Sequence, residues 1–160
     1  MNHTTLAGRR AQCGLAMVEF AIIGAVFFIV LFAVIEFGRT LFVVNTLTEA
    51  TRRGARMAAV CPVGSTAPAN AAINGANGSP VIGGLTSGNV VIEYLDTSGA
   101  VLGSPAGADY NSIRYVRARI TGFSLPLIIP FIMPTLSLTG FPATLPRESL
   151  GVTAAAIQPC

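Results

Sequence analysis

The sequence lacks most of the side chains that catalysis needs. It has no tryptophan or lysine, and its only histidine is His3. Its three cysteines, Cys13, Cys61 and Cys160, lie far apart, so neither a zinc site nor a Cys–His nucleophile can be assembled. A glycine-rich phosphate loop and a paired-carboxylate motif are also missing. We therefore expect no enzyme activity, no metal, no cofactor and no small-molecule substrate.

Charge is scarce as well, because only 11% of the residues are charged while 52% are hydrophobic. The net charge of +3 comes partly from Arg9 and Arg10, without which eight arginines face seven acids. With no basic run in the remainder, we expect no nucleic-acid partner. This composition favours a membrane or assembly protein over a soluble enzyme.

One long apolar segment is present. Leu15 to Ile35 contains 21 residues, of which only Glu19 is charged, and about 20 helical residues cross a hydrocarbon core of roughly 30 Å. After Ile35 the helix is predicted to become amphipathic until Pro62 stops it, so that it spans residues 15–60. Its apolar face would consist of Phe37, Leu41, Val44, Leu47, Ala50, Gly54, Ala55 and Ala58. On the polar face, Glu49 is placed to pair with Arg52 or Arg53.

Glu19 does not fit a plain membrane anchor. A carboxylate inside a membrane span costs roughly 2.5–3.5 kcal/mol or more, which makes it a functional candidate, although it is near enough to the helix start to reach the headgroups. Arg9 and Arg10 precede the span and predict a cytoplasmic N-terminus. A cleaved secretory signal is disfavoured, because the apolar run is too long and ends without a small-residue site.

The residues after Val60 are predicted to form a β-rich domain over 61–160. We expect a loop over 63–89, which is uncharged and rich in small residues, then a hairpin pairing Val90–Leu95 with Ala100–Leu102 across a turn at Asp96–Gly99. Tyr115–Thr121 alternates as a half-buried strand does, with Val116, Ala118 and Ile120 on one face.

Three prolines exclude a second membrane helix from the apolar run Phe123–Pro134, which is better explained as an extended segment lying on the long helix or on another subunit. Leu136–Thr139 and Val152–Ile157 are candidates for further strands. The predicted fold class is α+β, with a small antiparallel sheet packed on the amphipathic half of the helix, in a pilin-like arrangement.

Several of these segments resemble a known family. A basic leader ends at Gly14, and a glutamate and an aromatic residue, Glu19 and Phe20, follow at the fifth and sixth positions. This resembles the processing site of type IV pilin-like proteins. Together with Ile35–Arg39, Asn45 and Thr51–Arg56, it resembles the TadE-like family of pseudopilins from tight-adherence (Flp) pilus systems.

The resemblance implies a set of site residues. A prepilin peptidase would remove the cytoplasmic leader 1–14 by cutting after Gly14, making Leu15 the new N-terminus, with Glu19 and Phe20 as part of the recognised site. Glu19 would then pair with the positive N-terminus of a neighbouring subunit. Because Cys13 leaves with the leader, Cys61 and Cys160 are expected to form a disulfide in an oxidising compartment, with free thiols or an intermolecular bridge as alternatives.

The resemblance also implies the function and location. We expect a minor pilin or pseudopilin in the bacterial inner membrane, single-pass, with its C-terminal domain periplasmic or extracellular. Its partners would be the peptidase, other pilins or pseudopilins, and the inner-membrane assembly platform. The alternative is a membrane-anchored extracytoplasmic binding protein that is neither processed nor assembled.

Overall fold

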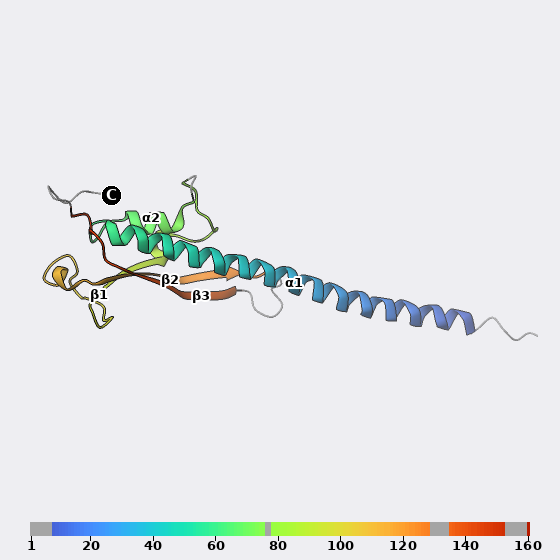
Figure 1. Ribbon diagram of the computed structural model, residues 1–160. Helices are drawn as coiled ribbons and strands as arrows, with labels where there is room; N and C mark the ends of the chain where they lie inside the picture. The colour runs from blue at the N-terminus through green and yellow to red at the C-terminus, as the bar shows by residue number, and fades with distance from the viewer. Residues whose placement is uncertain (1–7, 76–77, 129–134, 153–159) are drawn as a thin grey trace, which may run out of the picture. The chain divides into compact units, whose positions relative to one another are not determined.

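The computed structural model describes residues 8–75, 78–128, 135–152 and 160, with side chains from Gly14 onward (Figure 1). The chain forms two compact units, Met1–Arg39 and Thr40–Cys160. Its helices are α1 (Gly8–Val60), α2 (Ala67–Ile73) and the 3-10 turns η1 (Ser87–Asn89) and η2 (Tyr110–Ser112), and its strands are β1 (Val90–Leu95), β2 (Tyr115–Pro126) and β3 (Thr135–Pro146).

Helix α1 begins at Gly8, seven residues before the start expected at Leu15. The added turns contain Arg9, Arg10, Ala11 and Gln12, which are all good helix formers. The helix can therefore begin before the apolar segment. Among the described residues, α1 contains the one stretch that is long and apolar enough to cross a membrane. The 18-residue segment tested there has a mean hydropathy of 2.8, and none of its residues is buried.

The sheet is antiparallel with strand order β1-β2-β3, so that β2 is central and the other two strands form its edges. The alternation predicted for β2 is confirmed, because Val116, Ala118 and Ile120 are fully buried. Arg117 and Arg119 are half-buried on the opposite face. The strand continues beyond Thr121 to Pro126.

The C-terminal part of α1 provides the helical side of both cores (Figure 1). Val43, Leu47 and Ala50 pack in one cluster with Ile120 and other residues of β2. Ala58 belongs to a second cluster with Val116. This arrangement confirms the predicted α+β class.

The predicted apolar face of α1 is only partly right. Leu47, Ala50, Ala55 and Ala58 are buried, but Leu41 is 46% exposed. Val43 is buried instead, because it lies one turn before Leu47 on the face that contacts the core, whereas Leu41 is two residues away from Val43 and projects from a different side of the helix. Phe37, which lies in the N-terminal unit, is also exposed.

The loop expected over 63–89 is wrong in part, because it contains the helix α2. Pro68 lies in the first turn, where proline is tolerated, and the alanines that follow are strong helix formers. Helix α2 is held against α1 by small residues, and an added Cβ at Gly54 would lie 3.1 Å from the Cβ of Ala72. Ile82 and Leu85, farther along the same segment, are buried in the first core cluster.

The predicted hairpin is confirmed in a short form, because the turn is present and the return segment pairs with the end of β1. The N–H of Asp96 donates to the carbonyl oxygen of Ala100 (3.0 Å), and that of Leu102 donates to the carbonyl oxygen of Tyr94 (2.9 Å). Asp96 accepts hydrogen bonds from the backbone N–H groups of Ser98 (2.7 Å) and Ala100 (3.0 Å), and Gly99 has a positive φ of 84°. The return segment contributes only an isolated bridge between Leu95 and Val101. The strand that pairs with β1 along its length is β2, because β2 has the apolar face that completes the core.

The apolar run after Phe123 agrees with its prediction where the structure describes it. Phe123 and Leu125 extend β2 and pack on α1 in the first core cluster, while residues 129–134 lie outside the described part. The strand expected at Leu136–Thr139 is confirmed within β3. The strand expected at Val152–Ile157 falls almost wholly on residues that are not described.

Candidate processing and assembly site

The residues expected to direct processing lie within α1. Gly14 and Leu15 are both helical, and Leu15 is 72% exposed. Phe20 is 78% exposed one turn and a half farther on. The Gly14–Leu15 peptide bond therefore lies within α1. Glycine weakens the helix at this point, since it is less favourable than alanine in a helix by about 1 kcal/mol.

Glu19 is exposed on a helix surface that offers it no local partner. The residues one turn before and after it on the same face are Leu15, Ala16, Ile22 and Ile23, all of them apolar. A carboxylate surrounded in this way is costly in lipid unless a cation neutralises it.

The acid near the far end of the apolar segment behaves differently. Glu36 Oε1 accepts a hydrogen bond from Arg39 Nη2 at 2.7 Å, the favourable acid-first pairing along a helix. Glu36 is thus matched within its own helix. Glu19 has no equivalent basic residue one turn away on either side.

The pairs expected at Glu49 are not formed, since within the described residues no ion pair joins Glu49 to Arg52 or Arg53. Arg53 instead donates to the carbonyl oxygens of Asn74 (3.1 Å) and Ala72 (3.5 Å) at the C-terminal end of α2. A helix end presents unpaired carbonyls with a partial negative charge, which a guanidinium satisfies. The prediction was wrong because helical spacing alone gives no sign of α2, whose C-terminal end binds Arg53.

A compact charge cluster lies on the face of the sheet that carries Arg117 and Arg119. Glu93 of β1 accepts hydrogen bonds from the Nε atoms of both arginines, at 2.8 Å each, and forms ion pairs with both guanidinium groups. Burial alone raises the pKa of Glu93, but the two arginines outweigh it and hold that pKa below its ordinary value of 4.5. The sequence pattern did not indicate this cluster, because the register of β1 with β2 decides which residues pair.

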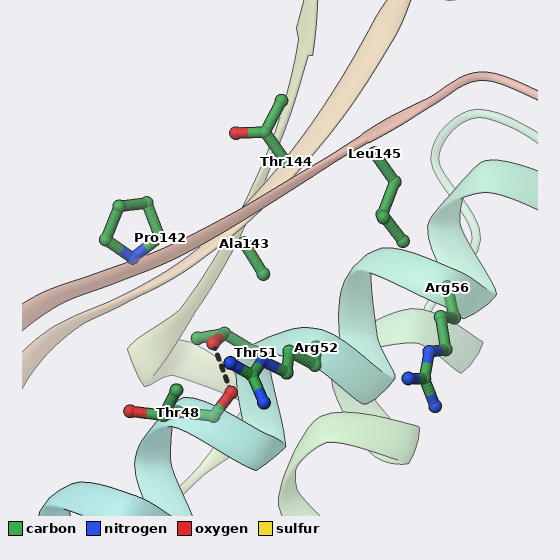
Figure 2. Close-up of a pocket in the computed structure, with 8 residues that line it drawn as sticks. All are labelled: Thr48, Thr51, Arg52, Arg56, Pro142, Ala143, Thr144 and Leu145. Atoms are coloured by element: carbon green, nitrogen blue, oxygen red, sulfur yellow. Dashed lines mark hydrogen bonds between the residues drawn. The ribbon is translucent and has the colours of Figure 1, made fainter.

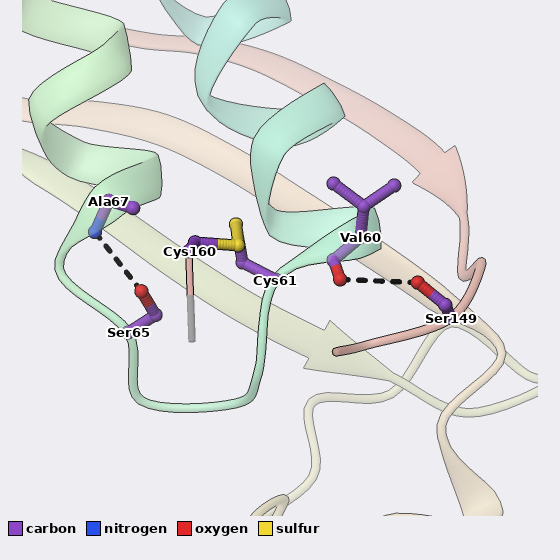
Figure 3. The surroundings of a disulfide bond; sticks show 6 residues. All are labelled: Val60, Cys61, Ser65, Ala67, Ser149 and Cys160. Carbon is purple, nitrogen blue, oxygen red and sulfur yellow. Dashed lines mark hydrogen bonds between the residues drawn. A yellow bond between two sulfur atoms is a disulfide. The ribbon is translucent and has the colours of Figure 1, made fainter. Parts of the chain in front are cut away.

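The disulfide expected between Cys61 and Cys160 is present, with Cα atoms 5.6 Å apart (Figure 3). Cys61 follows α1 directly and is fully buried. Nearby, the hydroxyl of Ser149 donates to the carbonyl oxygen of Val60, the last residue of α1 (Figure 3). The backbone N–H groups of Glu148 and Leu150 donate to Ala59. The end of α1 is therefore satisfied by a segment far along the chain.

Within the described part of the chain, no three metal-ligating side chains come close enough together to hold a metal ion. In the Gly14–Phe20 segment, which the sequence pattern also singles out, Glu19 is the one charged residue.

Comparison with known proteins agrees with the sequence resemblance. A family model described as TadE-like protein matches residues 14–56, beginning at Gly14 and ending at Arg56. The TadE-like resemblance is thus confirmed over the membrane segment and most of the amphipathic half of α1. Neither a curated protein nor a solved structure matches the chain.

Proposed function

We propose that this protein is a minor pilin or pseudopilin in the biogenesis of a tight-adherence (Flp) pilus. The observation that carries the proposal is the TadE-like match, which starts at Gly14 and covers the exposed apolar segment Leu15–Ile35, in which Glu19 is the only charged residue. The apolar part of α1 anchors the chain in the inner membrane with its N-terminus in the cytoplasm. Residues 61–160 then lie outside the cytoplasm.

In the proposed mechanism, prepilin peptidase removes residues 1–14, and Leu15 gains a free, positively charged amino group. Glu19 of one subunit binds the new N-terminus of its neighbour. Opposite charges interact far more strongly in lipid than in water, and a carboxylate left unpaired there is costly. Insertion of a subunit beside another therefore relieves the cost of Glu19, which makes the pairing selective for assembly. The assembly platform and other pilins or pseudopilins are the expected partners.

The N-terminal residue of the protein from its native membrane tests processing. We expect mass spectrometry to find Leu15 at the N-terminus when the peptidase is active, and Met1 when the peptidase gene is deleted. An N-terminus at Met1 in both strains would overturn the proposal and favour the unprocessed, membrane-anchored binding protein.

Glu19→Gln tests the pairing of charges. The variant keeps the shape of the side chain and removes its charge, so membrane insertion is expected to be retained or improved. We expect cleavage to Leu15 to continue while assembled pili fall by about tenfold or more, counted by electron microscopy and by sheared-fibre yield. Glu19→Asp, which retains the charge, is the matched control and should assemble better than Glu19→Gln. Normal pilus number in Glu19→Gln would contradict the mechanism.

A further inference from the structure

A groove runs between α1 and strand β3 within the C-terminal unit. It is lined by Thr48, Thr51, Arg52, Arg56, Pro142, Ala143, Thr144 and Leu145 (Figure 2), and we call it the Arg52–Arg56 groove. Figure 2 shows both arginines projecting from α1 next to β3. This surface is separate from the Gly14–Phe20 segment, and nothing in the proposed pilin mechanism uses it.

The two arginines bring an unneutralised positive charge to the groove. Arg52 and Arg56 are exposed and lie four residues apart, which places their Cβ atoms about 5–6 Å from each other on one face of the helix. Glu49 precedes Arg52 by three residues, and Glu148 lines a neighbouring pocket together with Arg56, but within the described residues neither acid forms an ion pair with Arg52 or Arg56. The groove is therefore complementary to a partner with negative charge.

The other polar side chains contributed by α1 are already engaged. Thr48 Oγ1 donates to the carbonyl oxygen of Val44 at 2.9 Å, and Thr51 Oγ1 donates to that of Thr48 at 2.8 Å. Their hydroxyl protons turn back to the helix. Recognition of an anion on the helical side thus falls to the two guanidinium groups, which bind carboxylates through paired N–H donors.

The opposite wall is the free edge of the sheet. Within the described residues strand β3 pairs only with β2, and four consecutive residues, Pro142 to Leu145, line the groove, so the unpaired edge of the strand faces it. An exposed edge accepts an additional extended segment. Pro142 and Pro146 lack N–H groups, and because successive N–H groups of a strand point to opposite edges, at most two of the three residues between them can donate at the free edge. Backbone pairing alone is therefore short, and side-chain charge must provide the selectivity.

We propose that the Arg52–Arg56 groove binds an extended acidic segment of a partner protein, with two carboxylates two residues apart. Residues i and i+2 of a strand project from the same face and are separated by about 6.7 Å, which matches the spacing of the two arginines on α1. Adjacent acids would point to opposite faces and could not engage both guanidinium groups. The proposal does not depend on cleavage after Gly14.

The test uses full-length protein in detergent micelles and a fluorescein-labelled peptide, Thr-Val-Glu-Thr-Glu-Val-Thr, with binding followed by fluorescence anisotropy. We expect saturable binding that weakens as salt is added. A peptide with both acids changed to glutamine, and one with the two acids adjacent, should each bind about tenfold more weakly or worse.

Variants of the protein test whether the peptide binds at the Arg52–Arg56 groove. Arg52→Gln/Arg56→Gln should raise the Kd for the Glu-Thr-Glu peptide by about tenfold or more, whereas Arg114→Gln, which removes an exposed arginine elsewhere, should leave it unchanged. The reversed variant Arg52→Glu/Arg56→Glu should instead bind an Arg-Thr-Arg version of the peptide. Because both side chains are exposed, the variants should keep the wild-type circular dichroism spectrum, which is recorded for each.

Three results would overturn the proposal. The first is a lack of binding by the Glu-Thr-Glu peptide, and the second is equal binding by wild type and Arg52→Gln/Arg56→Gln. The third is self-association of the purified protein that the double variant abolishes, since the occupant would then be a second copy. Each result is independent of the N-terminal sequence of the mature protein, so this proposal and the pilin proposal can fail separately.

Discussion

Arg53 differs from its neighbours Arg52 and Arg56 in being committed to the fold, through its two hydrogen bonds to the end of α2. Arg53→Met keeps the apolar length of the side chain and removes its donors. We expect a loss of about 1–3 kcal/mol in the free energy of unfolding, because the carbonyl oxygens of Ala72 and Asn74 lose their partner. Urea unfolding of the full chain measures it.

Arg52→Met is the matched control for that experiment. It changes an exposed arginine one position away, so its unfolding free energy should stay within about 0.5 kcal/mol of wild type. Equal losses in the two variants would contradict the assignment of a capping role to Arg53.

We expect the stability of the fold to depend on pH through the titration of Glu93. Its pKa in the folded protein lies below the ordinary value of 4.5, so its contribution is fully present above that value and is lost as the pH falls through the folded pKa. Urea midpoints measured from about pH 7 to about pH 3 should fall more steeply in wild type than in Glu93→Gln. Parallel curves for the two proteins would show that the Arg117–Glu93–Arg119 cluster contributes nothing to this dependence. Asp96, whose pKa is lowered chiefly by the Ser98 hydroxyl, titrates in both proteins and cancels in the comparison.

These residue roles mark the limit of what the sequence could predict about the sites. Glu19 stood out because it is a lone charge within an apolar run, which is a local pattern. Arg53 and Glu93 are placed by contacts with residues about 20 or more positions away, so their partners depend on the helix α2 and on the register of β1 with β2. Neither the presence of α2 nor the register of β1 with β2 can be predicted from the spacing of neighbouring residues.

Among the elements, the close approach of α1 to α2 and β2 depends on Gly54. A Cβ there would lie 3.1 Å from Ala72 Cβ and 3.3 Å from the carbonyl oxygen of Pro68. We expect Gly54→Val to destabilise the fold by about 1–3 kcal/mol, since a branched side chain forces the packed elements apart. Thermal unfolding followed by circular dichroism measures the change.

Gly38→Val serves as the control, because a Cβ at Gly38 meets nothing within 4 Å while the helical backbone is the same. That variant should not lower the unfolding temperature of the C-terminal unit. A similar loss in both variants would mean that the effect comes from helix propensity and not from packing.

The elements differ in how well they were predicted, for physical reasons. Helix α1 and strand β2 have long patterns of apolar residues, each typical of one kind of secondary structure, and the sequence predicted both elements. Helix α2 is seven residues of mostly small side chains, too short for a period to show. The local hairpin partner of β1 was predicted, because the turn at Asp96 brings the return segment back beside Leu95. The pairing of β1 with β2 was not predicted, because it depends on the distant core and on no local pattern.

At the scale of the whole molecule, the Cys61–Cys160 disulfide spans a sequence separation of 99 residues. In the chain-entropy model, closing such a loop stabilises the folded state by about 4–5 kcal/mol. The double variant Cys61→Ala/Cys160→Ala should lose that amount in urea unfolding, and wild type under reducing conditions should lose the same. A reduced wild type as stable as the oxidised protein would contradict this prediction.

The end of α1 is completed by residues near the C-terminus of the chain. The carbonyl oxygens of Ala59 and Val60 accept hydrogen bonds from the segment Glu148–Gly151, about ninety residues later, and Cys61 is bonded to Cys160. Because synthesis runs from the N-terminus, these bonds can form only after nearly the whole chain has been made. A chain that stops before Glu148 therefore leaves the last turn of α1 without these partners.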